Sequence, residues 1–407
     1  MAHLTGLGRF GIKAGLERTR SILDELGHPE RGLRGALVAG TNGKGSTGAF
    51  LEAILRAAGL RVGTLPSPHL RSYSERIQVD GVPISEPEFA RAVSELLPRL
   101  EPVSRRLGQP TEFELLTALA LEYLGPRVDW LVAEVGMGGR LDATNVLDLG
   151  VAVITNVALD HTQYLGGTVE QIASEKAGVI KTGNTVVTGA AGRSLEVIEA
   201  VAGEREATLW RLGGELRLEA RWLGWDGSEL SLAGPGFSHR GLHVSLLGSY
   251  QAANAALAVA AAHALGVDSA GAIADARWPG RFELWGDHPR VILDGGHNPA
   301  GLSALLGDVR RLLPGPGLVV VFAAMADKDL PAMFDVLRRA APGAVVFTAA
   351  SSAGDRAADP EAMARDYGAG QAVLPAAAAL ETARGLAGPD GTVLACGSLY
   401  LVGELRG

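Results

Sequence analysis

The spacing of apolar residues along this chain follows two periods that alternate, and it predicts strands and helices in regular succession. Short runs that are almost wholly apolar, such as residues 130–136 and 151–157, are typical of strands buried on both faces of a parallel sheet. Between such runs apolar residues recur every three or four positions, which indicates helices with one buried face. The predicted helices of the longer, first part of the chain are 11–26, 49–58, 86–107 with a break near Pro98, 112–124, 168–178, 195–202 and 250–265, and its further predicted strands are 36–39, 61–65 and 185–189.

Residues 216–247 have a different pattern, in which apolar and polar residues alternate around Asp226-Gly227. This favours an antiparallel hairpin at the edge of the first domain. The segment 277–281, with its proline and glycine, is typical of a linker, and the succession of strands and helices restarts after it. We therefore expect an α/β protein with a doubly wound domain at 1–279 and a smaller Rossmann-like α/β domain at 280–407. The predicted strands of the second domain are 291–293, 318–323, 344–348 and 392–395, and its predicted helices are 300–313, 330–340 and 375–385.

Composition narrows the class of protein. A chain of 407 residues is too long for one ordinary core, and its 47% apolar residues suffice for two. The net charge of −8 argues against a protein whose main work is to coat nucleic acid or a membrane surface, although a local basic patch for an anionic substrate stays open. The single cysteine, Cys396, permits neither an internal disulfide nor a thiolate metal site. We expect a cytoplasmic monomer without a membrane span.

Lysine is rare in this chain and is therefore informative. Of 37 basic residues only five are lysine, so arginine is used wherever it serves. A point charge or a titratable amine cannot be replaced by arginine, whose planar group is permanently charged. The lysines at 44, 176 and 328 consequently draw attention, beside those at 13 and 181.

Residues 36–47 read Ala-Leu-Val-Ala-Gly-Thr-Asn-Gly-Lys-Gly-Ser-Thr, a short apolar run that breaks into three glycines around one lysine. This pattern indicates a strand, a phosphate-binding loop and a helix N-terminus, with Lys44 as the mobile charge. The lysine stands between two glycines, so the spacing is a variant of the common phosphate-loop pattern. Phosphate binding, and a nucleoside triphosphate above all, is the favoured interpretation; a glycine turn that only joins strand to helix is the alternative.

Three further polar residues follow predicted strands at the edge where the phosphate loop lies: Ser67, Glu134 and His161. Oxygen ligands with one imidazole suit magnesium or manganese that bridges triphosphate oxygens. Taken singly, each also has a structural interpretation, as a turn former, a paired buried acid and a neighbour of a helix cap. Together with the phosphate loop they favour a metal site.

Two other segments add candidate chemistry to the first domain. The glycine-rich loop 136–145 carries Arg140, Asp142 and Asn145, whose strong hydrogen-bond donors and acceptors could order the ATP side of the catalytic centre. The alternative is a flexible loop that only connects two elements.

Lys176 lies on a predicted helix and would ordinarily face solvent. If desolvated, its amine can take up carbon dioxide and become a metal-binding carbamate.

In the second domain a strand opens into Asp294-Gly-Gly-His-Asn-Pro, so that Asp294, His297 and Asn298 should project at a second crevice. Residues 324–329 follow the next strand in the same way. Any Rossmann-like edge has this appearance, so neither segment is specific by itself.

Taken together, the motifs resemble those of the folylpolyglutamate synthase/dihydrofolate synthase family of the Mur ligase superfamily. They run in family order and cover nearly the whole chain. Two positions depart from the family pattern, Leu37 where histidine is common and Gly296 where alanine is common, and neither removes a proposed ligand. The matching segments are 38–46, 67–70, 73–77, 113–115, 134–145, 160–161, 175–178 and 294–299.

The resemblance implies an ATP-dependent ligase that joins L-glutamate to a folate, or to dihydropteroate, through an acyl phosphate. It implies a P-loop ATPase domain followed by a glutamate-ligase domain, with ATP and two Mg²⁺ ions bound between them and residues 278–280 as a hinge. The implied roles are Gly43, Lys44, Gly45, Ser46 and Thr47 for the phosphates; Ser67, Glu134 and His161 for magnesium; carbamylated Lys176 as a catalytic group with Lys44 and His297; Asn254, Arg281 and Asp294 for ATP from across the cleft; and His297 with Ser398 for glutamate.

Two alternatives remain open. A peptidoglycan ligase should carry a nucleotide-sugar domain ahead of the phosphate loop, and because the loop begins at residue 40 we expect none here. A P-loop hydrolase that joins nothing would turn over nucleotide without glutamate or folate.

Overall fold

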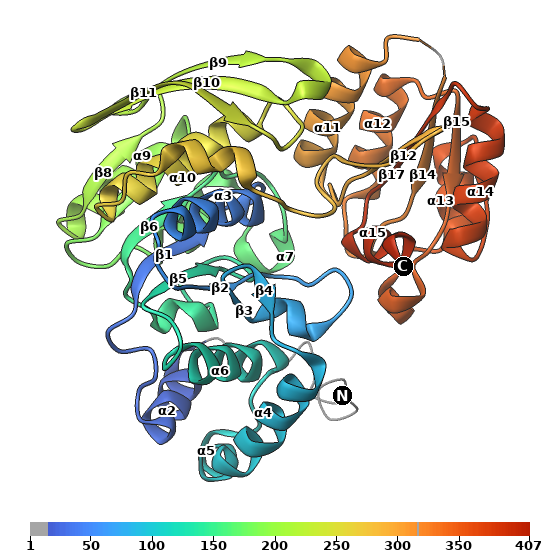
Figure 1. The fold of residues 1–407 in the computed structure, drawn as a ribbon. Helices are drawn as coiled ribbons and strands as arrows, with labels where there is room; N and C mark the ends of the chain where they lie inside the picture. The colour runs from blue at the N-terminus through green and yellow to red at the C-terminus, as the bar shows by residue number, and fades with distance from the viewer. Residues whose placement is uncertain (1–14, 316) are drawn as a thin grey trace. The chain divides into compact units, whose positions relative to one another are not determined.

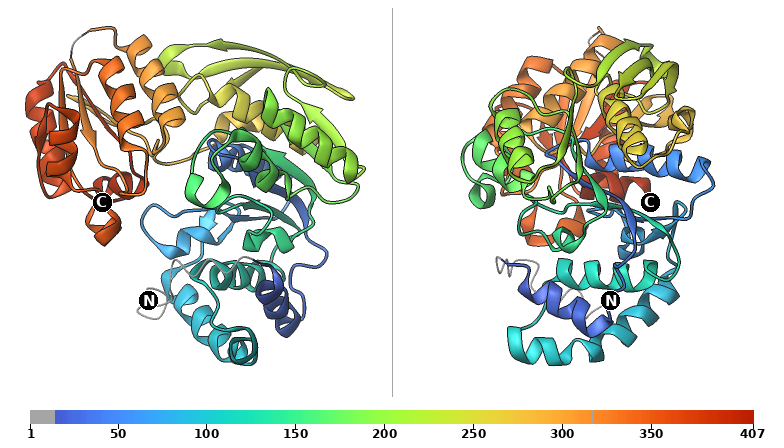
Figure 2. Two further views of the ribbon diagram at one scale, coloured as in Figure 1. Left: turned by 180° about the vertical axis from the view of Figure 1, so that it is seen from behind. Right: turned by 90° about the vertical axis from the view of Figure 1, so that its left-hand side faces the viewer.

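The computed structural model of the protein describes residues 15–315 and 317–407, which fold into two compact units (Figures 1 and 2). The first unit comprises the described residues up to Ala220 together with Glu229–His243 and Ala252–Ala276. The second comprises Arg221–Ser228, Val244–Gln251 and Arg277–Gly407. Among the described residues no helix is long and apolar enough to cross a membrane.

The first unit is built on an eight-stranded sheet with β1 (Arg34–Ala39) near its centre. β1 runs parallel to β5 (Trp130–Glu134) on one side and to β6 (Gly150–Ile154) on the other. Nearly every residue of these three strands is buried, as the apolar runs predict. The order is β4-β3-β2-β5-β1-β6-β7-β8, and the other strands are β2 (Val62–Leu65), β3 (Gln78–Val79), β4 (Val82–Pro83), β7 (Thr185–Thr188) and β8 (Thr208–Arg211).

Helices cover both faces of this sheet (Figure 1), which is why the middle residues of its central strands are apolar. A Cβ atom at Gly63 would meet Leu124 of α6 (Glu112–Leu124), so α6 covers that face. The Cβ position of Gly48, in α3 (Lys44–Ala57), lies 3.6 Å from the Val132 side chain on the other face. The other helices of the unit are α2 (Glu17–Leu26), α4 (Glu86–Arg99), α5 (Glu101–Leu107), α7 (Thr162–Leu165), α8 (Val169–Ala177), α9 (Arg193–Glu204) and α10 (Gln251–Ala264), with short 3₁₀ turns at Tyr73–Arg76, Ala143–Val146 and Ala270–Asp275.

The direction in which the chain crosses the sheet changes between β1 and β6. From β1 the chain crosses to β2 on one side, and from β6 it crosses to β7 on the other. The loops that follow β1 and β6 therefore diverge above adjacent strand ends, which is where ligands bind in open α/β sheets.

The segment 216–247 was predicted to form a two-stranded hairpin, but it contains three strands. The segment forms a separate sheet of order β11-β10-β9, with strands β9 (Arg217–Trp222), β10 (Ser228–Gly234) and β11 (Phe237–Val244). A 3₁₀ turn at Gly224–Asp226 joins β9 to β10, at the predicted Asp-Gly position. The third strand was missed because its apolar residues are sparse.

The second unit contains a six-stranded sheet of order β12-β13-β17-β14-β15-β16, parallel except for β12. α11 and α12 cover one face and α14 the other (Figure 1). The strands are β12 (Glu283–Asp287), β13 (Arg290–Leu293), β14 (Leu318–Phe322), β15 (Ala344–Phe347), β16 (Gln371–Ala372) and β17 (Thr392–Cys396), and the helices are α11 (Pro299–Leu312), α12 (Leu330–Ala340), α13 (Pro360–Tyr367), α14 (Ala376–Ala387) and α15 (Leu399–Arg406), with a 3₁₀ turn at Ser351–Arg356.

The predicted α/β fold is confirmed. So is the interruption of the helix near Pro98, where α4 ends and α5 begins. Residues 11–14 of the predicted helix 11–26 lie outside the described residues, and α2 forms the described part from Glu17 onward. The short or marginally apolar elements that the sequence did not predict include β3, β4, β8, β12, β16, α7, α13 and α15.

Candidate active site

The phosphate loop joins β1 to α3 through two glycines whose backbone suits no other residue. Gly40 has φ +148° and Gly43 has φ +84°, both in the region that L-residues rarely adopt. A Cβ atom on Gly40 would lie 1.8 Å from Thr155 Oγ1, and one on Gly43 would lie 2.4 Å from Asn254 Oδ1. The glycines thus allow neighbouring polar side chains to approach the loop, and α3 begins at Lys44 directly after it.

The loop after β6 holds the phosphate loop in place. The Asn156 amide acts like a strand partner, because the Asn42 amide donates to its Oδ1 at 3.0 Å while its Nδ2 donates to Asn42 O at 2.8 Å. Thr155 Oγ1 also donates to Asn42 O, at 2.7 Å. Asn156 was not predicted as a site residue, although it stands at a strand end in a chain that contains few asparagines.

We expect Gly40→Ala to disable the loop, because the new methyl group would overlap Thr155 Oγ1 and the backbone would be strained at φ +148°. The free energy of unfolding should fall by about 2–4 kcal/mol. Gly48→Ala in α3 is the matched control, since its Cβ would make an ordinary 3.6 Å contact. Urea denaturation of both variants tests this; equal stability of the two would contradict it.

Lys44, Glu134 and Ser67 form a connected set at the ends of β1, β5 and β2. Lys44 Nζ donates to Gly40 O at 3.2 Å and to Thr41 O at 3.4 Å, and lies 3.9 Å from Glu134 Oε1. The Ser67 amide donates to Glu134 Oε2 at 3.1 Å. Register explains this meeting, since Val38 of β1 pairs with Glu134, and Leu65 of β2 with Ala133.

His161 lies on the loop after β6, at the start of the short helix α7. It adopts the left-handed conformation with φ 51°, which is uncommon for a residue other than glycine, and it precedes α7 as its N-cap residue. Its amide donates to Asp160 Oδ1 at 2.9 Å, and its Nε2 is 3.9 Å from the same oxygen. Topology places His161 at the same sheet edge as Glu134, as the sequence predicts.

Lys176 is buried beside the phosphate loop. It lies on α8 with 4% of its surface exposed, and its Nζ donates to Gly40 O at 3.0 Å. Burial, followed by the charge of Lys44, lowers the pKa of Lys176 from 10.5 to about 7, although Asp160 and Asp142 oppose the shift. A large fraction of this amine is therefore neutral, and hence nucleophilic, near neutral pH.

The glycine-rich loop 136–145 packs against α8 and so positions Lys176. The Arg140 amide donates to Glu175 O at 2.7 Å, and the Arg140 guanidinium donates twice to Glu175 Oε1. Asn145 Nδ2 bridges Arg140 O and Gly178 O. Asp142 is buried, caps the turn through the Thr144 amide, and has its pKa raised by desolvation. These residues order the loop through contacts within the protein.

The structure corrects one placement. Asn254 was grouped with Arg281 and Asp294 on the far side of a cleft, but it lies on α10 in the first unit, against Gly43 of the phosphate loop. Sequence separation of the two residues gave no indication of this contact. Arg281 and Asp294 belong to the second unit.

Asp294 directly follows β13 and is buried in the second unit. Its carboxylate accepts from the Phe282 amide at 2.8 Å and from the Gly296 amide at 2.6 Å. Burial raises its pKa, while Arg281 and these two amides act in the opposite direction. The Arg281 guanidinium lies beside Gly295, where a Cβ atom would be 2.4 Å from Nη1, so Arg281 and Asp294 flank the same glycine.

His297 and Ser398 lie on loops that are hydrogen-bonded to each other. The Gly397 amide donates to Gly296 O at 3.0 Å, which joins the loop after β17 to the loop after β13. His297 Nδ1 contacts Gly295 O at 2.9 Å. Ser398 accepts from the Tyr400 amide as the cap of α15, so a structural task accounts for its hydroxyl.

The residues of the first unit fit a phosphate group and a hard divalent cation. Among the described residues, Thr47 Oγ1 is a buried hydroxyl oxygen without a hydrogen-bond partner, one turn into the helix that follows the loop. The loop, the N-terminus of α3 and the Lys44 ammonium suit an anion. The Glu134 carboxylate, the Ser67 hydroxyl and the His161 imidazole are donors that magnesium and manganese accept.

Fold and site thus define a two-unit α/β protein with a variant phosphate loop beside a carboxylate and a buried lysine, the organisation of a Mur-type ligase. Residues 38–262 match the model of the Mur ligase middle domain, and residues 280–399 match that of the Mur ligase, glutamate ligase domain. The chain belongs to the dihydrofolate synthase/folylpolyglutamate synthase family of the Mur ligases.

Three similar proteins represent this family. The dihydrofolate synthase/folylpolyglutamate synthase of Bacillus subtilis is 39% identical over 333 residues, which cover 79% of this chain and 77% of that protein. A structure of Escherichia coli FolC in complex with DHPP and ADP has a TM-score of 0.90 at 33% identity and covers 100% of this chain and 95% of that one. The Yersinia pestis bifunctional folylpolyglutamate synthase/dihydrofolate synthase, complexed with AMPPNP and a Mn ion, has a TM-score of 0.88 at 31% identity, covering 100% and 96%.

Proposed function

We propose that this protein is an ATP-dependent ligase that adds L-glutamate to a folate or to dihydropteroate. The observation that carries the proposal is the convergence of Lys44 and Lys176 on the Gly40 carbonyl, with Glu134 3.9 Å from Lys44, above the ends of central parallel strands. Relatives that carry folylpolyglutamate or dihydrofolate synthase names over most of their length support the substrate class.

The chemistry follows from the weakness of a carboxylate as an acyl donor. A carboxylate oxygen of the folate attacks the terminal phosphorus of ATP, the bond to ADP breaks, and an acyl phosphate forms. The glutamate amine then attacks the acyl carbon, phosphate leaves, and the amine proton is released. Lys44 and the amides around Gly43 would stabilise the charge on the transferred phosphoryl group.

Ser67, Glu134 and His161 would hold Mg²⁺ in this proposal. Bound magnesium neutralises charge on the phosphates and polarises the transferred group. We propose two ions, the second held with the help of Lys176 as its carbamate. The manganese and AMPPNP in the Yersinia pestis relative support a divalent metal beside the nucleotide.

The carbamate of Lys176 forms when the neutral amine attacks carbon dioxide and releases a proton. Support comes from the burial of the amine, which lowers its pKa to about 7, and from its place beside Gly40. Arginine could not take part in this reaction, which agrees with retention of lysine here in a chain that otherwise prefers arginine.

Residues 1–279 would form the ATP-binding domain and residues 280–407 the glutamate-ligase domain. Asn254 would contact the nucleotide from the phosphate-loop side, while Arg281 and Asp294 would contribute from the second domain. His297 and Ser398 would lie near the incoming glutamate. We also propose that the protein works as a cytoplasmic monomer without nucleic acid or a membrane, which its single buried cysteine and net negative charge support.

The proposal is tested by phosphate release from ATP and Mg²⁺ with glutamate and either dihydropteroate or tetrahydrofolate. We expect release to require glutamate together with one of the two pterins, and a product heavier by one glutamate residue. Activity with both pterins would show that one chain performs both steps. ATP hydrolysis that ignores glutamate would instead identify a P-loop hydrolase.

A further inference from the structure

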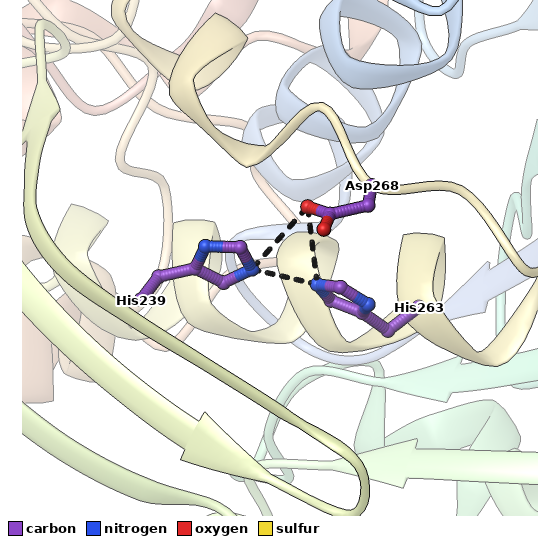
Figure 3. A group of neighbouring side chains, drawn as sticks. All are labelled: His239, His263 and Asp268. Atoms are coloured by element: carbon purple, nitrogen blue, oxygen red, sulfur yellow. Dashed lines mark hydrogen bonds and ion pairs between the residues drawn. The ribbon is translucent and has the colours of Figure 1, made fainter.

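A second group of metal-binding side chains lies away from the phosphate loop, at His239, His263 and Asp268 (Figure 3). His239 belongs to β11, His263 to the last turn of α10, and Asp268 to the segment after that helix, all within the first unit. Within residues 15–315 and 317–407, no other three His, Cys, Asp or Glu side chains have ligand atoms all within 4.8 Å of one another.

One ligand atom from each side chain faces a common point. The two Nε2 atoms are 2.7 Å apart, and Asp268 Oδ1 lies 3.6 Å from Nε2 of His239 and 3.8 Å from Nε2 of His263. The circle through three points with these separations has a radius of about 2.0 Å, which matches zinc bonds of about 2.0–2.2 Å to nitrogen and oxygen. An ion placed slightly out of the plane of these three atoms would remain within this range of all of them and leave a fourth position open.

Hydrogen bonding alone accounts for only part of this arrangement. One Nε2–H can be donated to the other Nε2, but the Asp268 oxygen is then beyond hydrogen-bond distance of both rings. The His263 ring is fixed by Phe237, which stacks on it at 4.0 Å with an interplanar angle of 5°. Three donors that converge, with one ring held by packing, are typical of a binding site for a cation.

We infer that His239, His263 and Asp268 bind one divalent transition-metal ion, with zinc as the best match. Two imidazoles and one carboxylate suit zinc better than magnesium, which prefers oxygen ligands. Because the Asp268 side chain is 70% exposed, the fourth position faces solvent and would hold water. Bound metal would join β11 to the end of α10 within the first unit, as a site separate from the one that we propose for magnesium.

The test is metal titration of the full-length chain after chelation, with excess Mg²⁺ present to occupy oxygen-rich sites. Co²⁺ serves as the spectroscopic probe and Zn²⁺ as the competitor. We expect one equivalent of Co²⁺ to give the visible absorption of a tetrahedral complex, and Zn²⁺ at about micromolar concentration to displace it. Zinc should also raise the thermal midpoint, because it binds only the folded chain.

His239→Gln and His263→Gln should each weaken zinc binding by about 100-fold or more, and Asp268→Asn by about tenfold. His28→Gln is the matched control. His28 also lies between two carboxylates, Asp24 and Glu30, but it faces them through different ring nitrogens and so cannot bring both to one ion. The exposed Asp268 permits a folded variant even if a histidine variant is unstable.

Any one of three outcomes would overturn the inference. The first is a wild-type chain that shows neither a tetrahedral cobalt spectrum nor a zinc-dependent thermal shift. The second is loss of zinc binding in His28→Gln as large as in His239→Gln. The third is retention of full affinity in Asp268→Asn and both histidine variants, since the ion would then be held elsewhere.

Discussion

Replacement of Lys44 by methionine is expected to lower glutamate-dependent turnover of ATP by about a thousandfold. Methionine keeps much of the apolar stem but supplies no charge where the transferred phosphoryl group develops its own. The ammonium group lies 3.2 Å from Gly40 O and 3.9 Å from Glu134 Oε1, so its loss also removes one positive charge from the neighbourhood of that carboxylate. Steady-state phosphate release with saturating glutamate and folate measures the effect.

Lys181→Met is the control for this prediction. Lys181 is also partly buried, and its Nζ donates to Asn145 O and Oδ1, both at 2.7 Å, so it supports structure away from the phosphate loop. We expect this variant to be less stable but to lose less than about tenfold in turnover. Comparable losses in the two lysine variants, or turnover by Lys44→Met above a tenth of the wild-type value, would refute a phosphate role for Lys44.

Much of the fold was predictable from the sequence because the strong signals are local. The strands β1, β5 and β6 are almost wholly apolar over five or six residues, and α6 has a capping box at Thr111 and Glu114 that marks its start. Parallel order then brings their carboxyl ends to one edge, which is why Glu134 could be assigned to the phosphate-loop side.

The features that the sequence did not reveal depend on contacts between distant segments. Asn254 lies against Gly43 although more than two hundred residues separate them, and nothing in the α10 pattern marks that face. His239 lies in a strand whose apolar alternation is weak, so neither its orientation nor its approach to His263 could be derived. Asn156 had a visible signal at a strand end, but its bidentate contact with Asn42 required the structure.

The two lysines of the proposed site are electrostatically coupled. Lys44 is the second cause, after burial, of the lowered pKa of Lys176. Removal of the Lys44 charge should therefore raise the Lys176 pKa and reduce the neutral fraction of its amine at a given pH. Part of the loss in Lys44→Met would then arise through Lys176, so the two substitutions should not be additive.

Lys176→Ala is expected to lower ligase turnover by about a hundredfold or more, because it removes the proposed carbamate. The proposed carbamate also fixes the direction in which wild-type activity should change with pH. Since the pKa of Lys176 is lowered from 10.5 to about 7, its neutral form increases as pH rises through 7, and only that form reacts with carbon dioxide. The amine is about one-tenth neutral at pH 6 and about nine-tenths neutral at pH 8. Activity should therefore fall below pH 7, and more steeply in buffer purged of carbon dioxide.

Rescue and labelling separate a carbamate from a buried structural lysine. A small carboxylate such as acetate can fill the space in Lys176→Ala and should restore part of its activity, whereas Lys176→Arg should not respond, because its guanidinium fills the space and carries a fixed positive charge. With ¹³C-bicarbonate, the wild type should show a carbamate carbon signal that both variants lack. Full activity of Lys176→Ala, or a wild-type enzyme indifferent to removal of carbon dioxide and devoid of that signal, would leave Lys176 as a packing residue held by the Gly40 carbonyl.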